Sequence, residues 1–258
     1  MGDRVLADTP FPPSVEDFYL PSIALGSWVT KFSLLIWLAV AVVIIFFLVS
    51  YRNPKLVPTK RQWLAESAYS FIRDGVAREV IGHDGLRFAP YLASLFLFIL
   101  VANIFGVIPL AQISPMSHIA YPIVLAVATY VLYLYLGIKK HGFGGYVKER
   151  LFPPGAPWPL YVLLTPIEFA QYFVVQPVTL SVRLFANMFA GHLILLVFTL
   201  GGFVLLGSGN IALAATGIIS FGMAIVMTLF EAVVAILQAY VFVVLTASYI
   251  QVSLADEH

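Results

Sequence analysis

Residues 211–254 decide the fold, and they read IALAATGIISFGMAIVMTLFEAVVAILQAYVFVVLTASYIQVSL. One charged residue, Glu231, interrupts this run of apolar side chains. A helix needs about 20 apolar residues to cross the hydrocarbon core of a bilayer, which is ~30 Å thick. This stretch would form a helix roughly 65–70 Å long, about twice that thickness. We therefore expect either one strongly tilted membrane-embedded helix or a helix that bends back on itself.

The stretch that precedes it, at 160–206, has the same apolar character and is equally long. The two are separated by the four residues GSGN at 207–210, a composition typical of a tight turn. The sequence thus predicts a long hairpin of two tilted helices, 160–206 and 211–254.

The whole chain has the composition of a membrane protein. Hydrophobic residues make up 61% of it, charged residues only 10%, and the mean hydropathy is +0.95. We expect a single all-α membrane domain, 1–258, with about five membrane-embedded helices. Its other predicted parts are an external N-terminal segment at 1–31, spans at 32–51, 88–108 and 119–138, an amphipathic surface helix at 59–80 and an inner loop at 139–159.

The basic residues predict the orientation. Apart from Arg183 inside the hairpin, and Arg4 and Lys31 near the start, they gather at 51–87 and 139–150, which the positive-inside rule places in the cytoplasm or matrix. The N-terminus would then lie outside and the C-terminus inside. The acidic, proline-rich start resembles neither a signal nor a transit peptide. The helix at 59–80 suits the membrane surface, although a solvated cytoplasmic helix would show the same pattern.

Charge and cysteine content exclude several functions. A net charge of +1 argues against a nucleic-acid partner. The chain has no cysteine, which removes disulfides, thiolate chemistry and cysteine-based metal sites. We expect no metal and no cofactor.

Three charged residues lie inside the predicted hairpin: Glu168, Arg183 and Glu231. A charge near the bilayer centre costs ~2.5–3.5 kcal/mol even on lenient scales, so each needs a partner or a function. The simplest explanation is an ion pair of Arg183 with Glu231 or Glu168. An antiparallel hairpin centred on the turn would instead place Arg183 level with Val234, within about one helical turn of Glu231 and Gln238.

Polar residues continue along both helices of the hairpin. Glu231, Gln238 and Tyr249 share one face of the last helix, because Gln238 and Tyr249 lie seven and eighteen residues after Glu231. On the partner helix Asn187 lies on the face of Arg183, and His192 points to the opposite side.

This spread through the membrane is more than one ion pair requires, and it suggests a proton path that is interrupted in the middle. Histidine and glutamate side chains can exchange protons near neutral pH. An arginine keeps its proton and would block direct passage.

Three motifs in these regions resemble subunit a of the F-type ATP synthases. The resemblance extends from the first span to the C-terminus, and the stretch around the arginine is its most specific part. The motifs are PVTLSVRLFANMFAGHL at 177–193, LQAYVF at 237–242 and NIFGVIP at 103–109.

The resemblance implies a stator subunit whose long helices press against a rotating ring of c subunits. Arg183 matches the essential arginine of the family, with Asn187 and Gln238 as its polar neighbours. His192 and Glu231 match two outer half-channel positions, which in many members hold glutamate and histidine instead. Glu168 resembles the inner-channel carboxylate, and Tyr249 continues the polar stripe.

The resemblance also implies partners and a location. The partners would be the c-ring, b-type subunits of the peripheral stalk, protons and membrane lipid. The chain would carry no catalytic residue of its own. We expect it to be multi-pass in a bacterial plasma membrane, a setting we favour over the mitochondrial inner membrane.

Two other classes compete with this interpretation. A self-contained secondary transporter would use Arg183 to bind an anionic substrate, but it should contain an inverted repeat, and the sequence has none that is convincing. An intramembrane enzyme would need a nucleophile with a base, or a metal cluster. His192 and Glu231 alone are too few for a metal site.

Overall fold

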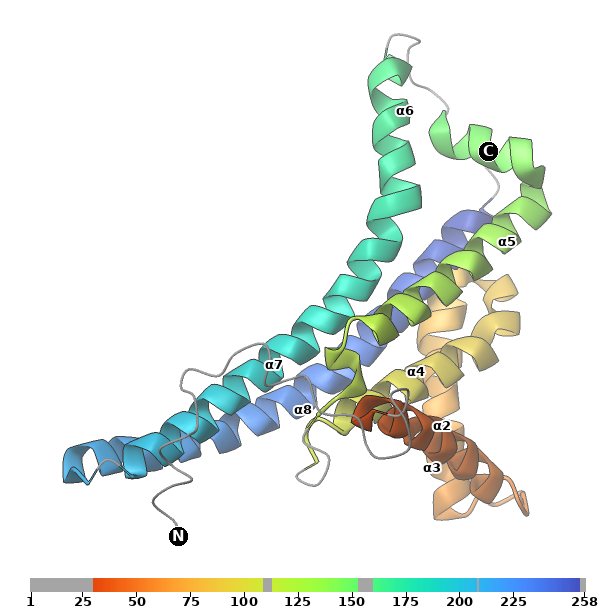
Figure 1. Cartoon of the computed structure of the whole chain (residues 1–258). Helices are drawn as coiled ribbons and strands as arrows, with labels where there is room; N and C mark the ends of the chain where they lie inside the picture. The colour runs from red at the N-terminus through yellow and green to blue at the C-terminus, as the bar shows by residue number, and fades with distance from the viewer. Residues whose placement is uncertain (1–29, 109–112, 153–159, 208, 256–258) are drawn as a thin grey trace. The chain divides into compact units, whose positions relative to one another are not determined.

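The structure is a computed structural model that describes residues 30–108, 113–152, 160–207 and 209–255 (Figure 1). Within these ranges the regular elements are all helical, and five helices are long and apolar enough to cross a membrane. This confirms the predicted all-α polytopic fold. The predicted N-terminal segment 1–31 lies almost entirely outside the described residues.

The first helices lie close to the predicted spans in the sequence. Helix α2, Lys31–Ser50, is the first span, and α4, Ala89–Ile104, is the second, entered through the 3₁₀ helix η3, His83–Phe88. Between them lies the predicted amphipathic segment, formed by α3, Lys60–Ile72, and the π-helix η2, Arg73–Ile81. The Thr59 side chain caps α3 by accepting a hydrogen bond from the Gln62 N–H at 3.4 Å.

Helix α5, Ala120–Leu151, continues well beyond residue 138, where the sequence analysis ended the third span. The basic residues after 138 are good helix formers, so the change to a polar composition does not end the helix. Gly142 instead bends it, with a φ of 71° that a residue without Cβ adopts readily. The predicted inner loop, 139–159, is therefore helical up to Leu151, and 153–159 lie outside the described residues. Before α5, the short 3₁₀ helix η4 spans Pro115–Ser117.

The two long segments differ in regularity. Helix α8, Ile211–Leu254, is unbroken and has the predicted bounds. The other consists of α6, Tyr161–Ala170, the π-helix η6, Gln171–Val175, and α7, Gln176–Leu206. Pro177 lies two residues after the end of the π-helix. Its ring clashes with the carbonyl four residues earlier and it donates no N–H, which accounts for the widened turn.

The chain divides into two compact units, which we describe separately. Unit 1 comprises Met1–Val42, Leu100–His118 and Ala186–Gln238; unit 2 comprises Val43–Ile99, Ile119–Phe185 and Ala239–His258. Each unit takes consecutive parts of several helices.

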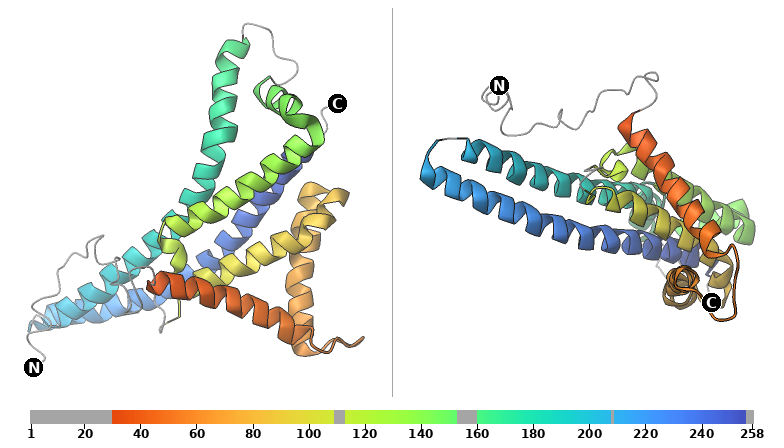
Figure 2. Two further views of the ribbon diagram at one scale, coloured as in Figure 1. Left: turned by 45° about the vertical axis from the view of Figure 1, so that its right-hand side comes forward. Right: turned by 90° about the horizontal axis from the view of Figure 1, so that it is seen from below.

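In unit 1 the parts of α7 and α8 on either side of the 207–210 turn lie antiparallel and side by side (Figures 1 and 2). The Ser220 hydroxyl donates a hydrogen bond to the Phe198 carbonyl at 2.7 Å, and the rings of Phe203 and Phe221 pack edge to face. Gly209 turns the chain with a φ of 69°. The predicted hairpin is therefore present in unit 1.

In unit 2 aromatic and aliphatic side chains of α3, α4 and the end of α8 form the core. The Phe71 ring lies 6.1 Å from that of Phe96 and 5.7 Å from that of Tyr240. Ile72, Leu92 and Phe242 are fully buried. The surface segment of the sequence prediction thus packs its apolar side against membrane-spanning helices.

Candidate functional site

The centre of unit 1 holds a histidine and a glutamate that face each other across the hairpin. His192 on α7 and Glu231 on α8 are only 5% and 4% exposed, and 3.2 Å separates Nδ1 from Oε1. Gly191 makes this approach possible, because a Cβ there would lie 2.9 Å from the same oxygen. The structure therefore brings together two residues that the sequence analysis assigned to one channel.

The backbone of the segment before η4 sets the proton position on His192. The Ser114 N–H donates a hydrogen bond to Nε2 at 2.9 Å, so this nitrogen is an acceptor. A neutral imidazole then carries its proton on Nδ1, the atom that faces Glu231. Gly106 allows the ring to fit, since a Cβ there would lie 2.5 Å from Cε1.

The Glu231 carboxyl is short of hydrogen-bond donors. Neither of its oxygens accepts a hydrogen bond of normal geometry from the described residues. Buried polar atoms are almost always hydrogen-bonded, so an under-satisfied buried carboxyl needs an explanation. A group that gains and loses a proton in the course of its function provides one.

Two further polar contacts continue along the hairpin. The Asn187 side chain donates to the Gln238 side-chain oxygen at 2.6 Å, and Gln238 is only 4% exposed. The Asn103 side chain donates to the Ala235 carbonyl at 3.4 Å. Polar groups of α4, α7 and α8 therefore meet inside unit 1.

The side-chain contacts across the hairpin are offset from the levels that the predicted register gives. Centred on the turn, it would place Asn187 level with Phe230, whereas Asn187 bonds Gln238, about two helical turns further along α8. Side chains tilt toward the N-terminus of their own helix. On two antiparallel helices the side-chain tips therefore shift in opposite directions relative to their Cα atoms. Each α7 side chain then contacts a residue later in α8 than the one whose Cα lies level with its own.

Arg183 lies at the middle of the helical path Tyr161–Leu206, and its side chain is exposed. His192, nine residues later on the same helix, is buried, as the predicted opposite faces require. Within the described part of the chain Arg183 forms no ion pair, so Glu168 of the same unit is not its partner. Glu231 is paired with His192 instead. The level of Arg183 relative to Val234 stays a prediction.

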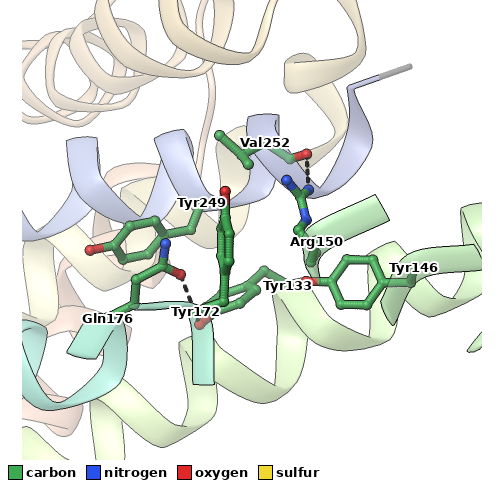
Figure 3. Close-up of a pocket in the computed structure, with 7 residues that line it drawn as sticks. All are labelled: Tyr133, Tyr146, Arg150, Tyr172, Gln176, Tyr249 and Val252. Carbon is green, nitrogen blue, oxygen red and sulfur yellow. Dashed lines mark hydrogen bonds between the residues drawn. The ribbon is translucent and has the colours of Figure 1, made fainter. Parts of the chain in front are cut away.

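Unit 2 contains a second polar cluster, around Tyr249 (Figure 3). It encloses a cavity of about 10 Å³, roughly the space of one water molecule. The Tyr133 hydroxyl donates to Gln176 at 3.3 Å. The cavity is lined by Tyr133, Tyr146, Arg150, Tyr172, Gln176, Tyr249 and Val252.

Arg150 ties this cluster together. Its guanidinium donates a hydrogen bond to the Val252 carbonyl near the end of α8. It also lies 5.4 Å from the ring centre of Tyr146 and 5.2 Å from that of Tyr172. The sequence analysis counted Arg150 only among the basic loop residues.

The sequence analysis missed Ser114 and Arg150 as site residues. A backbone N–H leaves no signal in a sequence, and the hydrogen-bond partners of Ser114 and Arg150, His192 and Val252, lie far along the chain. Gly106 had a weak signal, because it lies within the NIFGVIP motif. Among the described residues, no third His, Cys, Asp or Glu joins His192 and Glu231 to form a metal-binding group.

Together these features define a polytopic helical membrane protein with ionisable groups inside its spans. The ATP synthase A chain family matches residues 33–251, and the chain belongs to this family.

Its relatives named ATP synthase subunit a match nearly the whole chain. The one from Nocardioides is 42% identical over 96% of this chain and 94% of its own length. The one from Frankia alni is 45% identical over 98% of this chain and 90% of its own length. The one from Rhodococcus erythropolis is 42% identical over 98% of this chain and 94% of its own length. The chain is thus a stator component of the membrane sector, Fo, of an ATP synthase, a multi-pass membrane protein that serves proton transport and ATP synthesis.

Proposed function

We propose that the chain provides two offset proton half-channels to a rotating ring of c subunits, and that Arg183 separates the two. Protons enter from outside, neutralise a ring carboxylate and leave inward after nearly a full revolution. Each charge that crosses is worth ~2.3 kcal/mol per 100 mV, so several crossings can drive the formation of ATP elsewhere in the complex.

The observation that carries this proposal is the exposure of Arg183. A permanently charged side chain in mid-span is costly against lipid, and the described residues of its own chain offer it no ion-pair partner. Its neighbours Val178 and Val182 are also exposed, at 51% and 43%. A carboxylate of another subunit, presented against this face of α7, satisfies the charge.

His192 and Glu231 form the outer half-channel in this proposal. Their burial together in unit 1 supports it, as does the lack of donors to the carboxyl. Because the carboxyl lies 3.2 Å from His192 Nδ1 but accepts no hydrogen bond of normal geometry, we assign the proton exchange to the carboxyl. Asn187 and Gln238 extend the polar contacts along the hairpin.

Glu168 and Tyr249 belong to the inner half-channel. Glu168 on α6 is half-buried and Tyr249 adjoins the polar cavity of unit 2, and both therefore remain accessible to polar neighbours. The two half-channels do not connect directly, because Arg183 keeps its proton and repels others.

The partners follow from this role. The chain contacts the c-ring and b-type stalk subunits, contributes no catalytic residue to ATP formation, and resides in the plasma membrane of a bacterium. Its N-terminus faces outside and its C-terminus inside, as the basic segments 51–87 and 139–150 require.

The replacement Arg183→Ala tests the proposal. We expect proton-driven ATP synthesis in inverted membrane vesicles to be abolished, while the complex still assembles with the c-ring and the stalk. The mild replacement Val182→Ala on the same exposed face is the control and should retain synthesis. Synthesis near the wild-type rate in Arg183→Ala would refute the role.

A further inference from the structure

The junction between α2 and α3 contains a basic hollow that the proton path does not use. It measures about 560 Å³, within the usual range of small-ligand sites. Its lining residues all belong to unit 2 and come from the end of α2, the connecting segment and the start of α3. They are Val49, Ser50, Arg52, Asn53, Lys55, Thr59, Lys60 and Arg61.

The hollow has a uniform positive charge. It is lined by two arginines and two lysines, and the sequence has no acidic residue between Asp17 and Glu66. Within the described ranges none of these four side chains forms an ion pair. All four are exposed, so the hollow offers unneutralised donors to an anion.

A buried glutamine holds the loop around the hollow in one shape. The Gln62 side chain accepts from the Lys55 N–H at 3.1 Å and donates to the Lys55 carbonyl at 3.0 Å. It also donates to Glu66 at 2.8 Å and is only 5% exposed. Because these hydrogen bonds connect the two ends of the loop 55–62, the basic side chains project from a backbone of defined conformation.

Apolar side chains beside the hollow indicate a membrane surface. Leu56 and Val57, at the tip of the loop, are 105% and 82% exposed, and Trp63 on α3 is 59% exposed. Exposed aliphatic residues, an interfacial tryptophan and basic residues next to the end of a span are the combination by which proteins bind anionic lipid. An acidic protein partner would not require the apolar tip.

We propose that this hollow binds the phosphate headgroup of an anionic phospholipid, with the guanidinium and ammonium groups of Arg52, Lys55, Lys60 and Arg61 around the phosphate and Leu56 and Val57 inserted beside the acyl chains. Arginine binds phosphate oxygens in a bidentate manner, and lysine adds charge. The bound lipid would anchor the surface segment to the first span.

Fluorescence of Trp63 provides the test. The full-length chain with Trp28, Trp37 and Trp158 replaced by Phe is reconstituted in phosphatidylcholine vesicles that contain a minor fraction of brominated phosphatidylglycerol or of brominated phosphatidylcholine. We expect phosphatidylglycerol to quench Trp63 with an apparent affinity at least about threefold higher. Equal quenching by both lipids overturns the proposal and is the result expected if an acidic protein is the true partner.

Three variants separate a site from general attraction. Replacing Arg52, Lys55, Lys60 and Arg61 by Gln should remove the preference. The matched control replaces two other exposed arginines and two other exposed lysines, Arg78, Arg87, Lys139 and Lys148, and should keep it. The third variant, Gln62→Ala, changes no charge and should reduce the preference by opening the loop. An equal loss in both quadruple variants would show non-specific attraction and overturn the proposal.

Inorganic phosphate distinguishes the source of the anion. Added at constant ionic strength, it should not restore Trp63 fluorescence, because it lacks the acyl chains that hold the headgroup at the site. Full restoration would show that the hollow binds free phosphate rather than a lipid, against the proposal.

Discussion

Arg150 and Arg183 both belong to unit 2, yet their surroundings differ completely. Arg150, at the end of α5, donates to the Val252 carbonyl and lies over the rings of Tyr146 and Tyr172. Arg183, on α7 and at the middle of the helical path Tyr161–Leu206, is exposed and forms no ion pair with the residues that the structure describes.

The two arginines differ in whether their own chain provides the groups that compensate the charge. When its own chain provides its partners, the side chain joins helices and acts on stability. When its own chain leaves the charge unpaired inside a span, another molecule has to compensate it, because lipid does not. By this criterion we predict a structural role for Arg150 and a functional role for Arg183.

Glu231 provides the strongest test of this criterion, because we predict a functional role for it although it has a partner in its own chain. Like Arg150 it meets a partner in its own chain, but a carboxyl can release its proton and an arginine cannot. We expect Glu231→Gln to slow passive proton flux through Fo by about tenfold or more, since a positioned proton-exchanging group has been removed. Flux is measured by acidification of vesicles that carry Fo alone.

Glu168→Gln provides a parallel test of the proposed inner side, and Glu79→Gln, an exposed position outside the spans, is the control. Unchanged flux in Glu231→Gln would mean that pairing marks a structural role for carboxylates as well.

Ser114 provides a further test, because we predict that its backbone N–H, which carries no charge, affects proton flux through His192. The φ of −78° at Ser114 is compatible with proline, so Ser114→Pro removes the N–H that bonds His192 and retains the local conformation. We expect proton flux to fall by about three- to tenfold, the value of one hydrogen bond. Nitrogen NMR of labelled histidine should show the proton no longer confined to Nδ1.

Ser114→Ala is the matched control for this change. It removes the hydroxyl, which donates to the Ala102 carbonyl at 3.1 Å, but keeps the N–H. If alanine and proline lower the flux equally, the hydroxyl rather than the backbone N–H is responsible.

Arg150→Gln should give the opposite result to a change at Arg183. It removes the contacts with two rings and leaves the Val252 carbonyl without its donor. We expect the free energy of unfolding in detergent to fall by about 1–3 kcal/mol, while proton flux per assembled complex changes less than about twofold. A large loss of flux with unchanged stability would place Arg150 in the proton path.

The smallest effect is expected at the surface segment. The Arg73 side chain donates two hydrogen bonds to Asp74, which lower the pKa of the Asp74 carboxyl. The ionised pair therefore adds stability above the unfolded pKa of about 3.9, and this is lost as the pH falls through the lower folded value.

We expect Asp74→Asn to lower the melting temperature at neutral pH by about 1 °C or less, because the pair is exposed. The difference from the wild-type chain should vanish in acid. Asp84→Asn serves as the control, and a difference that persists at low pH would show that the effect does not come from the ionised carboxyl.

Some features could be predicted from local properties of the chain. Helix α8 has the predicted bounds because apolar composition over more than two bilayer thicknesses leaves few alternatives to a helix. The opposite environments of Arg183 and His192 follow from their spacing on one helix. The helix that contains the predicted third span continues past residue 138 to Leu151, because a change in polarity is no helix stop.

Hydropathy and helical periodicity act over neighbouring residues, and they are enough to predict a helical, membrane-embedded protein that is charged at a few costly positions. Which residues meet depends on the tertiary structure. It joined Glu231 to His192, directed the Ser114 N–H to the imidazole, and paired Asn187 with Gln238 rather than with its level neighbour. These contacts depend on side-chain tilt, on the room left by glycines and on the path of distant segments, none of which is a local property of the chain.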